Sequence, residues 1–191
     1  MEAVLKEIEA LYVSLVPETL NELDSSDELY AAFIPYFGWT MYAEEQAEAG
    51  REIFLLKTEY FEECELKEPD PGKLGYNTYC WGAFIDNCGI VEVESKELHQ
   101  CLLKWCEHQI ENDDSILNIE YMKKIGGCLA NACRKLNGFS WDPNRFNADF
   151  VVFTDCMADE VHEHNLKHCV SDEWLKKQKS TGLFETYYTI D

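Results

Sequence analysis

The sequence predicts an α+β fold, in which an antiparallel or mixed sheet carries helices packed mainly on one face. Three observations predict it. Apolar residues make up 46% of the 191 residues, which is enough for a packed core and for a single domain spanning 1–191. Strand-like apolar and aromatic runs lie mostly in the first half, and helical periodicity dominates the second half. The chain contains no internal repeat.

The first predicted element is an amphipathic helix over residues 2–16, whose apolar residues recur every three or four positions. Pro17 either ends this helix or begins a further turn. After a polar break, the aromatic run 29–42 is expected to form one or two strands, and Pro35 within it favours an edge position or a bulge. The apolar run 53–61 fits a helix or a strand, and we favour a strand.

The middle of the chain contains a predicted hairpin. A loop over 67–75, with two prolines and two glycines, precedes expected strands over 76–85 and 90–93. The four residues 86–89 between these strands tolerate positive φ and form a suitable turn. We therefore expect the two strands to pair with each other.

Two helices are predicted next. Ser95 is a suitable N-cap for the first of them. The second runs over residues 116–136 and stops at Gly138. Its interior contains Gly126 and Gly127, which lower helix propensity, and we attribute them to close packing against a neighbouring helix.

The last part of the chain combines strands and helices. The continuously apolar run 150–154 is typical of a central strand, which is buried on both faces. Helices are expected over 157–168 and 172–179, with Ser171 capping the second. A final strand is expected over 184–190.

The net charge is strongly negative and unevenly distributed. The chain has 37 acidic and 16 basic residues, which gives −21. Residues 1–95 hold 21 acidic and 5 basic residues, a net of −16, whereas residues 96–191 hold 16 and 11, a net of −5. This charge repels phosphate backbones and anionic lipid, so nucleic-acid and membrane binding are disfavoured.

Two interpretations of the acidic N-terminal half remain open. One is a solvated surface that keeps the protein soluble. The other is a docking face for a basic protein partner, which charge would steer into contact and exposed aromatic residues would anchor. The carboxylates that we expect to carry such docking form two clusters: Glu44, Glu45 and Glu48, and Glu62, Glu63 and Glu65.

The sequence also favours a cytoplasmic protein without a cofactor. Residues 1–10 include three glutamates and lack the apolar region of a signal peptide. No uncharged apolar stretch approaches the roughly 20 residues of a membrane-spanning helix. The nine cysteines are odd in number and include no Cys-x-x-Cys pair, so reduced and mostly buried thiols are expected.

An alternative function rests on the segment Asp155–Cys169, which is rich in histidine, cysteine and carboxylate side chains. His164 and His168 share one face of a helix and, with Cys169, form a candidate metal site. A polar helix surface with solvated histidines explains the same spacing. Cys156 is a nucleophile only if the fold brings a base to it. A metal- or cysteine-dependent enzyme is therefore the second hypothesis, with its catalytic residues unassigned.

With these elements in order, the chain resembles a set of uncharacterised small bacterial proteins. The resemblance includes WGAF (81–84) before the predicted hairpin and the strand FNADFVVFTD (146–155). Some members of such sets are grouped with immunity proteins of polymorphic toxin systems. The resemblance implies a stoichiometric protein inhibitor and assigns a role to no residue. The acidic charge fits an inhibitor whose target is a basic toxin, such as a nuclease.

Overall fold

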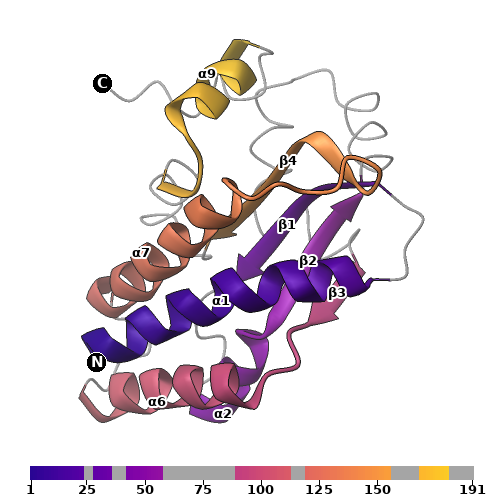
Figure 1. Ribbon diagram of the computed structural model, residues 1–191. Coiled ribbons are helices and arrows are strands. Elements are labelled where there is room, and N and C mark those ends of the chain that lie inside the picture. The colour runs from indigo at the N-terminus through magenta and orange to yellow at the C-terminus, as the bar shows by residue number, and fades with distance from the viewer. Residues whose placement is uncertain (24–27, 36–41, 58–88, 113–118, 156–167, 181–191) are drawn as a thin grey trace.

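The computed structural model describes residues 1–23, 28–35, 42–57, 89–112, 119–155 and 168–180. This part of the chain contains both helices and a mixed sheet, which confirms the predicted α+β class. The elements, shown in Figure 1, are α1 (Glu2–Glu22), β1 (Leu29–Pro35), α2 (Ala43–Ala49), β2 (Glu52–Lys57), β3 (Gly89–Glu92), α6 (Lys96–Asn112), α7 (Ile119–Leu136), β4 (Phe146–Asp155) and α9 (Asp172–Ser180).

The four described strands form one mixed sheet in the order β3-β2-β1-β4. Strand β1 runs antiparallel to β2 and parallel to β4, and β3 runs antiparallel to β2. Strand β3 confirms the strand predicted over 90–93, and within the described residues it pairs with β2. Its expected partner, residues 76–85, lies outside the described residues, as does the expected strand 184–190.

Two positions in the sheet differ from expectation. Strand β4 lies at an end of the described sheet rather than in its centre. Its residues Val151, Val152 and Phe153 are nonetheless buried, because burial on both faces does not require a strand on both sides. Strand β1 lies between two strands although it contains Pro35. This proline is the last residue of the strand, where its missing N–H removes no bond from the middle of the ladder.

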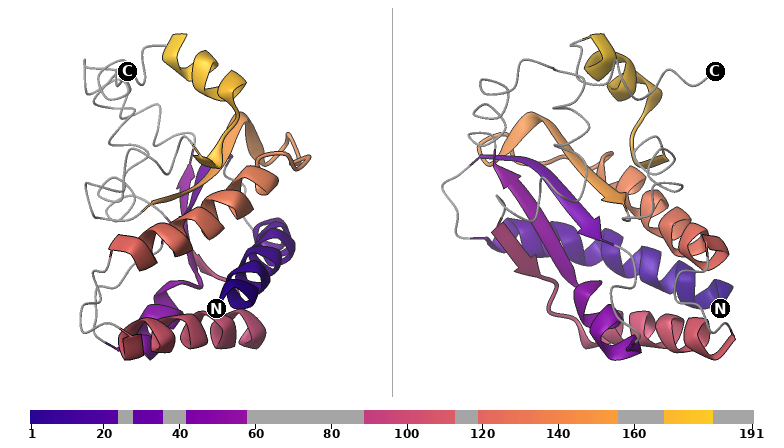
Figure 2. Two further views of the ribbon diagram at one scale, coloured as in Figure 1. Left: turned by 90° about the vertical axis from the view of Figure 1, so that its left-hand side faces the viewer. Right: turned by 180° about the vertical axis from the view of Figure 1, so that it is seen from behind.

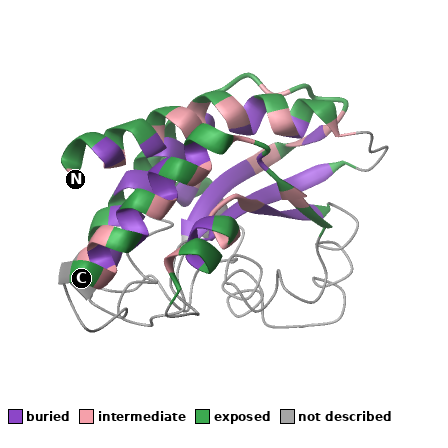
Figure 3. Ribbon diagram, turned by 90° about the horizontal axis from the view of Figure 1, so that it is seen from below, coloured by how far each residue is buried: buried purple, intermediate pink, exposed green. Residues whose placement is uncertain are grey.

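The helices lie mainly on one face of the sheet. Helix α1 runs across that face, with α7 along one of its sides and α6 along the other (Figures 1 and 2). Helix α7 also contacts β4, and the short helix α2 packs against α6. Viewed from below, the strands are largely buried, while each long helix alternates buried and exposed residues (Figure 3). No described helix is long and apolar enough to cross a membrane.

Helix α1 continues through Pro17 to Glu22, further than the prediction of residues 2–16. Its buried residues recur along one face, from Val4 through Ile8 and Tyr12 to Leu20. The hydroxyl of Tyr12 donates a hydrogen bond to the carbonyl of Gly50, which joins α1 to the turn between α2 and β2.

The predicted helix caps are present. The Ser95 Oγ accepts a hydrogen bond of 3.1 Å from the Leu98 N–H, and the Ser171 Oγ accepts one of 3.1 Å from the Trp174 N–H. The prediction that the glycine pair in α7 allows close packing against a neighbouring helix is wrong for Gly127. This residue is exposed, and no neighbouring atom would meet a Cβ added there.

Candidate partner-binding surface

The first predicted cluster of carboxylates lies on helix α2. Glu44, Glu45 and Glu48 are all exposed, while Gln46 and Ala47 of the same helix are buried. These two buried residues explain how a short, acidic helix stays attached to the domain, since they turn its carboxylates outwards. The second cluster, Glu62, Glu63 and Glu65, lies outside the described residues.

One of these glutamates is engaged within the protein. The Glu44 Oε1 lies 3.0 Å from the Nε2 of His99 on α6. Because an ionised carboxylate only accepts hydrogen bonds, the His99 ring donates from Nε2. This contact links α2 to α6. Glu45 and Glu48 are exposed and form no ion pair with any residue that the structure describes.

Three carboxylates converge where α2 leads into the sheet. Glu52 of β2 and Glu92 of β3 are direct partners in the antiparallel register. Burial raises the pKa of Glu52, and the negative charges of Glu92 and Glu48 raise it further. Arg51 lies 2.6 Å from the Glu92 carboxylate. One cation therefore stands among three carboxylates.

A groove extends this acidic surface towards α1. It has a volume of about 360 Å³ and lies between the C-terminal half of α1 and the residues of β3 and its extension. Leu15, Leu23 and Val91 form apolar parts of its wall. Four further lining residues are carboxylates, two from the helix and two from the strand and its extension: Glu18, Glu22, Glu92 and Glu94.

The strand beside the groove is exposed. Strand β3 lies at an end of the described sheet, and its Gly89 and Glu92 are accessible to solvent. The side chain of Ile90 is 58% exposed, which is unusual for a large apolar residue in a strand. We call the surface formed by the carboxylates of this region the acidic edge; it comprises Glu18, Glu22, Glu48, Glu52, Glu92 and Glu94.

Of the residues in the acidic edge, only Glu48 belongs to the carboxylate clusters predicted from the sequence. The other five residues are separated in the chain by up to 76 positions between Glu18 and Glu94. Only the packing of α1 and the pairing of β2 with β3 bring them together. The regional charge of −16 in residues 1–95 was the available signal, and it did not single out these positions.

The structure describes little of the alternative site. His164 lies outside the described residues, so the metal site of His164, His168 and Cys169 stays a prediction. The candidate nucleophile Cys156 also lies outside the described residues. His168 is exposed, whereas Cys169 is fully buried. Within the described ranges, no group of three or more His, Cys, Asp or Glu residues is arranged to hold a metal ion.

The thiols that the structure describes are buried. Cys101, Cys106, Cys128, Cys133 and Cys169 are free and buried, in agreement with the prediction. Burial, with a smaller contribution from nearby glutamates, raises the pKa of Cys106 and of Cys128 to about 12. Burial also raises the pKa of Cys133 well above its usual range, and the neighbouring Cys169 adds to this effect. Such thiols stay protonated and are poor nucleophiles.

Comparison of this chain with protein-family models, with curated proteins and with solved structures finds no match. The resemblance to immunity-type proteins is therefore an expectation without further support.

Proposed function

We propose that this protein is a cytoplasmic binding protein that captures a basic protein partner at its acidic edge, as an immunity-type inhibitor captures a toxin. The observation that supports this proposal is the direct pairing of Glu52 with Glu92 across β2 and β3. Carboxylates in this relation repel each other, and Arg51, which lies 2.6 Å from Glu92, offsets this repulsion only in part, since Glu48 adds a third negative charge. A cation supplied by a partner relieves that repulsion.

The arrangement of charge and apolar surface suits recognition of a protein. The excess of negative charge accelerates the approach of a basic partner, and this effect weakens as salt screens it. Ile90 offers an exposed apolar contact beside the carboxylates, where a contact can be desolvated when the complex forms. The groove between α1 and β3 accepts a lysine or arginine side chain among the four carboxylates that line it.

The partner is to be identified by native mass spectrometry of the protein purified gently from its own host. The expected result is a basic protein bound at a fixed stoichiometry. An acidic or neutral partner, or a metal ion removed by a chelator in place of a protein, contradicts the proposal.

The site is then tested with two matched charge reversals. The variant Glu18→Lys/Glu22→Lys changes two exposed carboxylates four residues apart near the C-terminus of α1, in the acidic edge. The control Glu107→Lys/Glu111→Lys makes the same change near the C-terminus of α6. We expect the first variant to slow association about tenfold at low salt and the control to slow it less than about threefold. Equal effects of both would mean that only net charge matters.

A further inference from the structure

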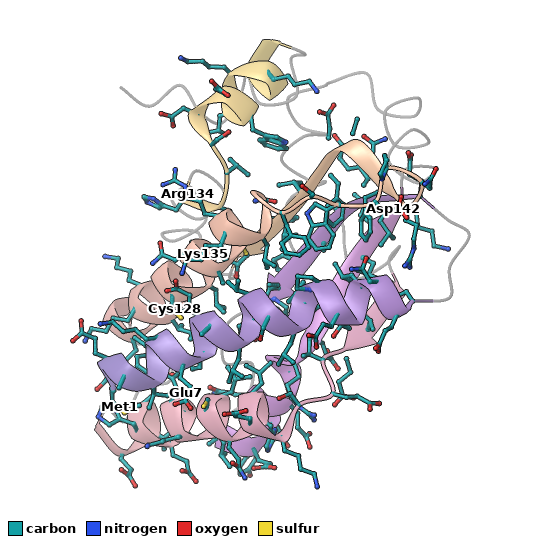
Figure 4. All side chains as sticks on the ribbon, in the orientation of Figure 1. Met1, Glu7, Cys128, Arg134, Lys135 and Asp142 are labelled. Atoms are coloured by element: carbon teal, nitrogen blue, oxygen red, sulfur yellow. The ribbon has the colours of Figure 1, made fainter. Side chains whose placement is uncertain are left out.

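A cavity lies at the opposite end of α1 from the acidic groove. It has a volume of about 420 Å³. The start of α1, the end of α6 and the start of α7 meet there, at the end marked N in Figure 1 and near the labelled Met1 in Figure 4. The volume lies within the range typical of small-molecule sites. The lining residues come from all three helices: Met1, Glu2, Leu5, Trp105, His108, Tyr121 and Lys124.

Three flat side chains form much of its wall. The ring of Tyr121 meets that of Trp105 edge-on, with centroids 5.9 Å apart and an interplanar angle of 63°. It meets the ring of His108 in the same way, at 6.1 Å and 63°. Trp105 is buried and held by the helix packing. Because these rings meet at steep angles, a planar ligand ring can stack on the face of one ring or contact the edge of another.

Positive charge lies at one side of the cavity. The Nζ of Lys124 stands 5.3 Å from the centroid of the Tyr121 ring. The N-terminus of α1 has no side-chain cap among the described residues, and Met1, Glu2 and Leu5 from this end line the cavity, which places the positive end of the helix dipole beside it. Glu2 is the carboxylate found among the described lining residues, and it is exposed. The cavity thus combines an aromatic wall with a cationic side in an otherwise acidic protein.

We propose that this cavity binds a small planar aromatic carboxylate, whose ring packs against the wall formed by Tyr121 and Leu5 and whose carboxylate pairs with Lys124. The ring provides the apolar area that the aromatic wall can bury. The ammonium group of Lys124 selects an anionic substituent over a neutral or cationic one. This proposal is independent of the acidic edge, which involves the other end of α1.

The test uses the full chain and three probes that share one ring system: indole-3-acetate, indole and tryptamine. Binding is followed by the shift of the Trp105 indole N–H in NMR spectra, assigned with the variant Trp105→Phe. We expect indole-3-acetate to bind about tenfold more tightly than indole, and tryptamine to bind most weakly. In Lys124→Gln, whose cavity keeps its rings, the three affinities should converge.

A matched pair of variants locates the site. Leu5→Trp fills the cavity and should abolish the shift, whereas Leu15→Trp makes the same change on the same helix beside the acidic groove and should preserve it. Circular dichroism tests whether both variants fold. No shift with millimolar indole-3-acetate, unchanged binding in folded Leu5→Trp, or equal affinities for the three probes in the natural protein would overturn the proposal. If Leu5→Trp fails to fold, Lys124→Gln still decides whether the carboxylate is recognised.

Discussion

The side-chain amide of Asn137 binds both backbone groups of Val152 in β4. Its Nδ2 donates to the Val152 carbonyl at 2.8 Å, and its Oδ1 accepts from the Val152 N–H at 2.7 Å. The Nδ2 also donates to the carbonyl of Cys169 at 2.7 Å. One amide beyond the end of α7 therefore satisfies three backbone groups and joins α7, β4 and the segment that leads to α9.

Replacing Asn137 by alanine should lower the free energy of unfolding by about 3 kcal/mol, because three partly buried backbone groups lose their partner. Urea denaturation at neutral pH measures the change. Asn131→Ala, at an exposed position of α7, is the control and should alter stability by less than about 0.5 kcal/mol. A loss below about 1 kcal/mol for Asn137→Ala would show that water or a shifted backbone replaces the amide.

Because the carboxylates of the acidic edge repel one another, removing the charge of Glu52 should raise the free energy of unfolding by an amount that depends on pH. Burial and the charges of Glu92 and Glu48 raise the pKa of Glu52 in the folded state. The proton on Glu52 therefore stabilises the fold below its ordinary pKa, and this contribution is lost as the pH rises through the raised pKa. Glu52→Gln should be more stable than the natural protein by about 0.5 kcal/mol at pH 7. The difference should shrink towards zero near pH 3.

Denaturation curves of Glu52→Gln at several pH values provide this comparison. Glu107→Gln, which neutralises an exposed carboxylate of α6, serves as the control and should show no comparable gain at pH 7. A Glu52→Gln variant that is less stable than the natural protein at pH 7 would mean that the Glu52 carboxylate makes a favourable contact in the fold.

Local signals in the sequence predicted where two helices start better than they predicted the sheet. Ser95 and Ser171 cap helices through bonds to N–H groups three residues away, so the sequence around each serine determines them. The pairing of β3 with β2 joins residues on opposite sides of a long intervening segment, and no local pattern specifies it. Helix α2 was missed because only two of its seven residues, Gln46 and Ala47, are buried, which is too few for a detectable periodicity.

The negative charge of the candidate site, and the half of the chain that carries it, were predictable from the sequence. The residues that form the site were not. The excess of acids in residues 1–95 left two interpretations open, a solvated surface and an acidic docking face. Whether two glutamates such as Glu52 and Glu92 oppose each other depends on strand register, and a shift of one residue would move their side chains to different faces. The groove carboxylates Glu18 and Glu94 likewise meet only through tertiary packing.

The buried thiols should resist alkylation. With a pKa near 12, Cys106 and Cys128 are thiolates about a thousandfold less often at pH 8 than an ordinary cysteine. Treatment with iodoacetamide, followed by peptide mass spectrometry, should leave both unmodified in the native protein within an hour. Both should react within minutes in urea, which provides the control. Rapid native modification of either residue would show that its helix opens locally and frequently.

The end of α1 depends on a residue far away in the sequence. The guanidinium of Arg145, just before β4, donates hydrogen bonds to the carbonyls of Leu20, Asn21 and Leu23. Helix α1 has no basic residue in its own last turn, so Arg145 supplies both the donors and the positive charge that this end requires.

Arg145→Ala should therefore lower the free energy of unfolding by about 2 kcal/mol in urea denaturation, whereas Lys6→Ala, which removes a positive charge from an exposed site on the same helix, should change it little. Arg145→Lys keeps the charge but loses the planar fork that reaches three carbonyls, so it should recover less than half of the loss. Full recovery by lysine would mean that the charge, and not the geometry of the donors, stabilises the end of α1.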